Sequence, residues 1–95
     1  MERENNMQAI VTVVGSDKVG IIAEVSSLLS AHGVNIVDIT QTILSGNFVM
    51  MMMVELSAAD ISIDELRDLL SKTSEKMHVE INVMAEKVFS AMHRI

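Results

Sequence analysis

Two β-rich segments joined by a short turn constrain the fold more than any other part of the sequence. Residues 34–44 (VNIVDITQTIL) and 47–56 (NFVMMMMVEL) are rich in β-branched and apolar side chains, and Ser45-Gly46 separates them. A two-residue connection that ends in glycine is typical of a tight reversal between antiparallel strands. The sequence therefore predicts a β-hairpin over these residues.

Patterns on the amino-terminal side predict a strand followed by a helix. Met7 to Val14 alternates as a strand, and Ile21 to His32 has the apolar spacing of a helix with one buried stripe. Gly33 follows directly, where a helix commonly ends in a left-handed residue. This strand–helix pair leads into the hairpin.

Patterns on the carboxyl-terminal side predict a helix followed by a strand. Ser62 and Glu65 have the spacing of a capping box, which opens a second helix. Met77 to Met84 alternates as a half-buried strand, and residues 85–95 have helical spacing. The predicted order β-α-β-β-α-β is that of a ferredoxin-like α+β sandwich, with four antiparallel strands, two helices on one face and here a short C-terminal helix. We expect one domain over residues 1–95, with its βαββαβ core at about 7–84.

The predicted strands are apolar on both sides, although the helices cover only one face of the sheet. In the segment 47–56, one face carries Phe48, Met50, Met52 and Val54, and the other carries Val49, Met51 and Met53. In the segment 34–44, strict alternation opposes Val37, Ile39 and Ile43 to Val34, Ile36 and Leu44. An apolar sheet face without cover is an interaction surface. We therefore predict a homodimer.

Composition and charge exclude several classes of protein. The net charge of −6, the seven scattered Lys and Arg residues and the two phenylalanines do not fit a nucleic-acid-binding protein. Without cysteine, there is no thiol chemistry and no Cys-type metal site, and we expect no metal and no cofactor. The start MERENNMQ does not resemble a signal peptide, and the longest apolar run (48–54) is far shorter than the ~18 residues of a membrane span. We expect a cytoplasmic protein that does not associate with membranes.

The stretch Gly15-Ser-Asp-Lys-Val-Gly20 lies where the first strand passes into the first helix. The free N–H groups and the positive dipole end of a helix N-terminus attract an anionic group such as a carboxylate. Gly20 would let a ligand or a neighbouring strand approach the backbone, and Asp17 would cap the helix or bind an ammonium group. The simpler interpretation is that Gly15 allows a turn and Asp17 only caps the helix. The residues alone leave both open.

The element order and the stretch GSDKVGIIAEVSSLLSAHGVNIVDITQ together resemble an ACT domain, the small-molecule-binding regulatory module of amino-acid metabolism. The matching positions are Asp17, Lys18, Val19 and Gly20 at the first helix, then Gly33, Asn35 and Ile36. The ending AMHRI (91–95) is similar to that of small freestanding ACT proteins of uncharacterised function, relatives of the ACT repeats in the glycine-cleavage regulator. Val19 departs from the family, in which proline is common at this position.

The resemblance implies a ligand site shared between two subunits. Asp17 would contact the amino group of an amino acid, the backbone near Val19 to Ile21 its carboxylate, and Asn35 of the other subunit would complete the site. The residues implied in ligand binding are Gly15, Asp17, Lys18, Val19, Gly20, Ile21, Asn35 and Ile36. The implied function is a non-catalytic regulatory module that binds an amino acid or a similar metabolite and acts on a protein partner. The alternative is a ligand-free dimerisation or scaffold module.

Other candidate residues give weaker signals. An acylphosphatase-like enzyme would need an arginine in the first loop, where the chain has only Lys18, and the serines lack a base at a recognisable spacing. Asp38 is expected either at a solvent-facing sheet edge or in the ligand site. We interpret His32, His78 and His93 as surface or boundary residues, the acids at 60–68 as a solvated helix start, and Met50 to Met53 as strand and dimer packing.

Overall fold

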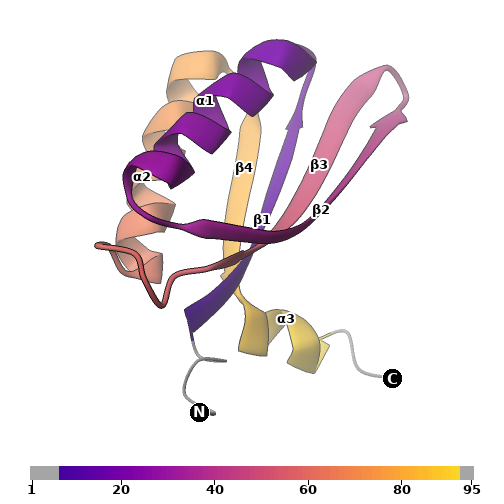
Figure 1. The fold of residues 1–95 in the computed structure, drawn as a ribbon. Helices are drawn as coiled ribbons and strands as arrows, with labels where there is room; N and C mark the ends of the chain where they lie inside the picture. The colour runs from indigo at the N-terminus through magenta and orange to yellow at the C-terminus, as the bar shows by residue number, and fades with distance from the viewer. Residues whose placement is uncertain (1–6, 93–95) are drawn as a thin grey trace.

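The chain folds into a two-layer α+β sandwich in the computed structural model, which describes residues 7–92 (Figure 1). The elements are β1 (Gln8–Gly15), α1 (Lys18–Ala31), β2 (Asn35–Leu44), β3 (Asn47–Glu55), α2 (Ile63–Met77), β4 (Glu80–Ala85) and α3 (Glu86–Met92). The four strands form one antiparallel sheet in the order β2-β3-β1-β4. The predicted ferredoxin-like fold is confirmed. Residues 93–95 of the predicted C-terminal helix, His93 among them, lie outside the described residues.

The hydrophobic core lies between the sheet and the layer formed by α1 and α2. Its floor is formed by alternate residues of β1 and β3, and its roof by one stripe of each helix. The largest fully buried side chains are Ile21, Leu29, Met50, Met52, Leu56, Leu66, Leu70, Val11, Val13, Val25 and Val54. Burial of these side chains is the main favourable term that holds the helices on the sheet.

The predicted hairpin is present. β2 and β3 pair in antiparallel fashion up to Leu44 and Asn47. Ser45 and Gly46 between them both have positive φ, 53° and 80°, as a two-residue type I′ turn requires. In Figure 1 this hairpin extends away from the helical layer, so that its tip stands apart from α1 and α2.

The helix boundaries differ from the prediction at two places. α1 begins at Lys18, three residues before the predicted start, because Asp17 caps it there. α2 begins as predicted with a complete capping box between Ser62 and Glu65, but it continues to Met77. His78 then ends the helix in a left-handed conformation (φ 58°), so the prediction that the last strand starts at Met77 was wrong, and β4 starts at Glu80.

A β-bulge near the start of β2 changes which side chains share a face. Ile36 pairs with Val54 and Asp38 with Met53, which leaves Val37 as the extra residue. Strict alternation was therefore the wrong expectation for this strand. After the bulge, Ile39 and Ile43 lie on the same side of the sheet as Ile36, the side of the helices, while Asp38 lies on the opposite side.

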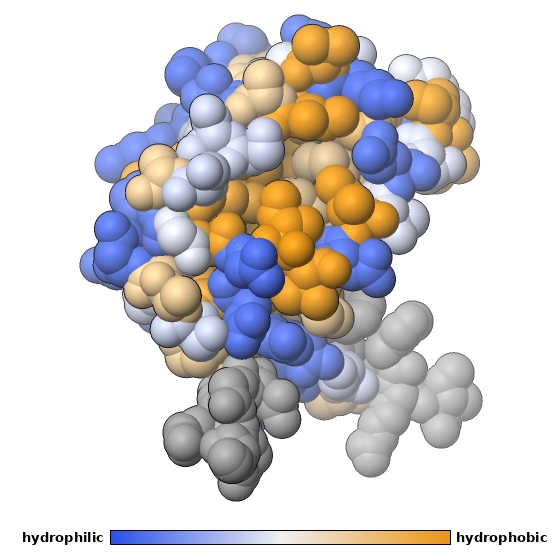
Figure 2. Space-filling model, viewed as in Figure 1, coloured by the Kyte–Doolittle hydropathy of each residue, from blue (hydrophilic) through white to orange (hydrophobic). Residues whose placement is uncertain are grey.

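Two parts of the sheet surface are not covered by α1 or α2, although the short α3 packs against β1 and β4. The first is β2, an edge strand in which all ten residues are exposed, apolar ones included. Figure 2 shows hydrophobic side chains gathered over β2 and between α1 and the hairpin. The second is the sheet face opposite α1 and α2, which we call the bare face. Within residues 7–92, no helix is both long and apolar enough to cross a membrane.

Candidate functional site

The turn between β1 and α1 is held by Asp17. Its carboxylate Oδ1 accepts a hydrogen bond from the backbone N–H of Gly20 at 3.2 Å, and its carbonyl accepts one from Ile21 at 2.9 Å. A Cβ on Gly20 would lie 2.7 Å from Oδ2 of Asp17. Gly20 therefore makes room for the capping carboxylate, and the prediction that Asp17 caps the helix is confirmed.

Gly15 is required by close packing. A Cβ at this position would lie 2.6 Å from Cγ1 of Val79 and 2.7 Å from Cδ1 of Ile21. These two apolar side chains close over the end of β1, from the connection before β4 and from α1 respectively. Both glycines of the loop thus have a role within a single chain.

Lys18 and Val19 form the open side of the same loop. The Lys18 ammonium lies 5.8 Å from the centroid of the Phe48 ring, within cation–π range. Lys18 and Phe48 line a shallow hollow of about 190 Å³ together with Gln41, Thr42 and Ile43. Val19 is 77% exposed, and as first-turn residues Lys18 and Val19 have N–H groups without an intrahelical acceptor. The hollow can accept an anionic or polar group between the loop and the far end of β2.

Asn35 and Ile36 lie at the other end of the sheet. Asn35 pairs with Glu55, whereas the loop residue Gly15 pairs with Phe48, seven positions away along β3. At ~3.4 Å per residue, this separation is about 24 Å. Within one chain, the structure does not bring Asn35 to the loop. It does bring Gln41, Thr42 and Phe48 there, which were not among the predicted site residues. The length of the hairpin was the signal that could have identified them.

The other candidate residues are dispersed. Asp38 is exposed on the bare face and lines a different hollow, described below. His32 is half-buried with Nδ1 2.9 Å from Oδ1 of Asp60, and His78 is exposed, as expected of boundary and surface residues. Among the described residues, no group of three or more His, Asp, Glu or Cys side chains is arranged to hold a metal ion.

Comparison with known proteins defines the class. The chain matches the ACT domain family over residues 7–84, and it belongs to that family. ACT domains are in general regulatory modules for small ligands. The chain is also similar to small proteins of the uncharacterised UPF0237 family. A UPF0237 protein of Methanopyrus kandleri is 48% identical over 93% of this chain and 98% of its own length. A UPF0237 protein of Listeria innocua is 43% identical over 94% of this chain and its own entire length.

Solved structures agree with this family assignment. An ACT domain protein from Streptococcus pneumoniae superimposes with a TM-score of 0.75 at 36% identity, covering 94% of this chain and 97% of that protein. A formyltetrahydrofolate deformylase from Pseudomonas syringae superimposes with a TM-score of 0.73 over 82% of this chain and 27% of the deformylase. At 22% identity, the second likeness shows a shared fold.

Proposed function

We propose that the chain is a dimeric regulatory module that binds an amino acid or a similar small metabolite between two copies. The proposed ligand-binding residues are Gly15, Asp17, Lys18, Val19, Gly20, Ile21, Asn35 and Ile36. The observation that carries the proposal is the opposite placement of the loop and Asn35 at the two ends of an open β2 edge. Regulation then follows by linkage, because a ligand that binds one dimer arrangement more tightly shifts the population toward it.

Edge-to-edge pairing would supply the missing half of the site. Consider two copies whose β2 strands pair in antiparallel fashion about a two-fold axis near the middle of the strand. The start of β2 in one copy then lies beside the end of β2 in the other. Asn35 of one copy then comes close to Ile43 and Leu44 of the other, beside the hollow that Lys18 lines. An amino acid in this position would meet the first-turn N–H groups of α1 from one copy and the Asn35 amide from the other.

The outer surface of α1 supports the same arrangement. The only charged residues of α1 are Lys18 and Glu24. Apart from Lys18, the exposed residues of this helix are Val19, Ala23, Ser27, Ser30 and Ala31. In α2, by contrast, charged residues cover the solvent side: Asp64, Glu65, Arg67, Asp68, Lys72, Glu75 and Lys76. A helix with few charges beside an uncovered strand is suited to an interface rather than to solvent.

One observation favours a second candidate function, a ligand-free dimerisation module. Asp17, Gly15 and Gly20 each have a capping or packing role within the single chain, so a ligand is not needed to explain them. Such a module forms the same dimer and binds no amino acid.

Thermal unfolding of the wild type and Asn35→Ala with each common amino acid distinguishes the two functions. A ligand at 100 times its dissociation constant stabilises the folded state by about 2.7 kcal/mol, which corresponds to a midpoint shift of about 10–20 °C for a domain of this size. A shift with one amino acid, abolished in Asn35→Ala, is the expected result. Asn47→Ala, also an exposed asparagine at the start of a strand, is the matched control and should keep the shift. A shift that survives in Asn35→Ala would contradict the proposed site, and no shift with any amino acid would favour the dimerisation module.

A further inference from the structure

The bare face of the sheet carries apolar side chains interspersed with polar ones. The strand register places the apolar Ile10, Val14, Val49, Met51, Met53 and Met84 on this side of β1, β3 and β4, together with the polar Thr12 and Asn82. Met51 is 40% exposed, while its chain neighbours Met50 and Met52, which point to the helices, are buried. Methionine is flexible and polarisable, and it occurs at protein surfaces that adapt to apolar partner side chains.

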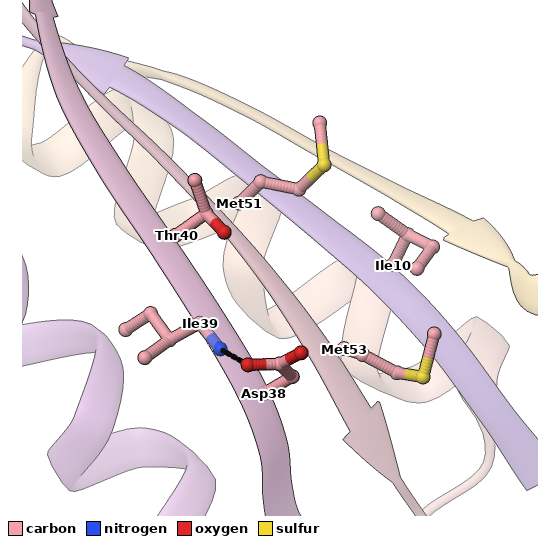
Figure 3. Close-up of a pocket in the computed structure, with 6 residues that line it drawn as sticks. All are labelled: Ile10, Asp38, Ile39, Thr40, Met51 and Met53. Atoms are coloured by element: carbon pink, nitrogen blue, oxygen red, sulfur yellow. Dashed lines mark hydrogen bonds between the residues drawn. The ribbon is translucent and has the colours of Figure 1, made fainter.

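The centre of this face contains a hollow suited to one apolar side chain. Its volume is about 170 Å³, and its lining consists of Ile10, Asp38, Ile39, Thr40, Met51 and Met53. In Figure 3 the Ile39 side chain points away to the other side of the strand, while the Asp38 carboxylate lies beside Met53. For comparison, an apolar cavity of ~150 Å³ accommodates a benzene molecule. A leucine or phenylalanine side chain would therefore fit beside a carboxylate.

The charges of the bare face are all of one sign. Asp38 lies on the β2 edge, Glu55 at the end of β3, and Glu80 at the start of β4, where it pairs with Val14. None of the four strands contains Lys, Arg or His. α3 packs against β1 and β4 and adds one acid, Glu86, and one base, Lys87, so it does not change the net charge of this face. Three acids thus lie on the face that contains the methionine-lined hollow, and the strands carry no base there.

The β2 bulge contributes to this arrangement. Without Val37 as an extra residue, Asp38 would pair with Met52 and face the helix side, and Ile39 would take its place on the bare face. The bulge therefore presents the carboxylate beside the hollow, which is the kind of side-chain redirection that bulges provide near binding sites. The Asp38 carboxylate also accepts a hydrogen bond from the N–H of Ile39 at 2.9 Å, which fixes its orientation.

We infer that the bare face binds a basic amphipathic helix of a partner protein. Apolar side chains of that helix enter the methionine-lined hollow, and its Lys or Arg residues meet Asp38, Glu55 and Glu80. A second copy of this chain is the wrong occupant, because pairing two bare faces opposes acid to acid with no strand base to compensate. This surface lies apart from the β1–α1 loop, so the inference does not depend on a ligand in the proposed amino-acid site.

Fluorescence anisotropy with a labelled synthetic peptide tests the inference on the full chain. The probe is a Leu–Lys peptide of about 18 residues, five helical turns with leucines on one face, and the peptide control replaces every Lys by Glu. We expect the Leu–Lys peptide to bind and the Leu–Glu peptide to bind at least about tenfold more weakly. Failure of the Leu–Lys peptide to bind at millimolar concentration would overturn the inference.

Matched variants separate this face from the general negative charge of the chain. Asp38→Lys replaces one attraction by a repulsion and should weaken peptide binding about three- to tenfold, whereas Asp68→Lys makes the same charge change on exposed α2 and should change it less than about twofold. Met51→Lys should weaken binding similarly, with Ser71→Lys on α2 as its control. Equal effects at Asp38 and Asp68 would show binding to net charge alone. A change in self-association with Met51→Lys, at unchanged peptide binding, would identify a second copy as the occupant and overturn the inference.

Discussion

The two edge strands of the sheet differ in how their free edges are protected. β4 has six residues and packs beneath α2, and Arg67 of α2 donates from Nε and one Nη to the Val83 carbonyl, both at 3.3 Å. β2 has ten exposed residues without Lys, Arg or Pro. Its bulge lies near one end and leaves residues 38–44 regular and open. Proteins normally protect free edges by short strands, basic residues, proline or cover. β4 is protected within the chain, and β2 is suited to pairing with a second copy.

Substitutions on the β4 side and on the β2 side of the sheet should differ most in their effect on the free energy of unfolding. Leu66 of α2 is fully buried above the closed side of the sheet, so Leu66→Ala removes buried methyl groups and leaves a cavity. We expect a loss of about 2–5 kcal/mol in the free energy of unfolding. Urea denaturation followed by circular dichroism measures the loss.

Ile43→Ala is the comparison on the open side. Ile43 is 63% exposed on β2, so in the monomer this change should cost less than about 0.5 kcal/mol. Its effect should appear instead as weaker dimerisation at higher protein concentration. If Ile43→Ala destabilised the dilute monomer as much as Leu66→Ala, the open and closed sides would not differ as described.

A charge in the middle of β2 should break the proposed dimer. In a pair of β2 strands related by a two-fold axis near Thr40, the Thr40→Lys change places two ammonium groups close together. At ~4 Å their repulsion is about 1 kcal/mol in water and about 4 kcal/mol at the effective dielectric of a protein surface. We therefore expect the dimer dissociation constant, measured by sedimentation equilibrium, to rise about fivefold or more. Asn82→Lys on β4 carries the same charge to the closed edge and should leave the dissociation constant unchanged; equal effects would place the interface elsewhere.

Most helices and strands could be predicted from local patterns in the sequence. The features that the prediction missed depend on contacts between residues that are far apart in the sequence. The hairpin, the capping box and Gly33 depend on neighbouring residues, and all three are present. The β2 bulge depends on pairing with β3, so alternation within 34–44 could not reveal that Asp38 faces away from the helices. The requirement for glycine at position 15 also depends on a distant residue, because Val79 is one of the two side chains that leave no room for a Cβ there.

The candidate site shows the same division. The residues of the β1–α1 loop are contiguous, so the sequence could identify them as a group and propose Asp17 as one of two things, a cap or a ligand contact; the structure shows the cap. Their proximity to Gln41, Thr42 and Phe48 arises from the register of β1 on β3, which was not part of the prediction. The role of Asn35 depends on a second chain and stays a prediction.

The smallest expected effect concerns the protection of the β4 edge. Arg67→Met keeps most of the apolar stem but removes the two N–H groups that cover the Val83 carbonyl, and it also removes the ion pair with Asp64. Because about half of the side chain is exposed, we expect a loss of only about 0.5–1.5 kcal/mol in the free energy of unfolding. Amide hydrogen exchange should report the change more sharply, with faster exchange confined to β4 while β1 and β3 keep their protection. Asp64→Asn breaks the ion pair but leaves the Arg67–Val83 hydrogen bonds, so it should not speed exchange in β4. If Asp64→Asn and Arg67→Met had equal effects, the ion pair rather than the covered carbonyl would account for the closed edge.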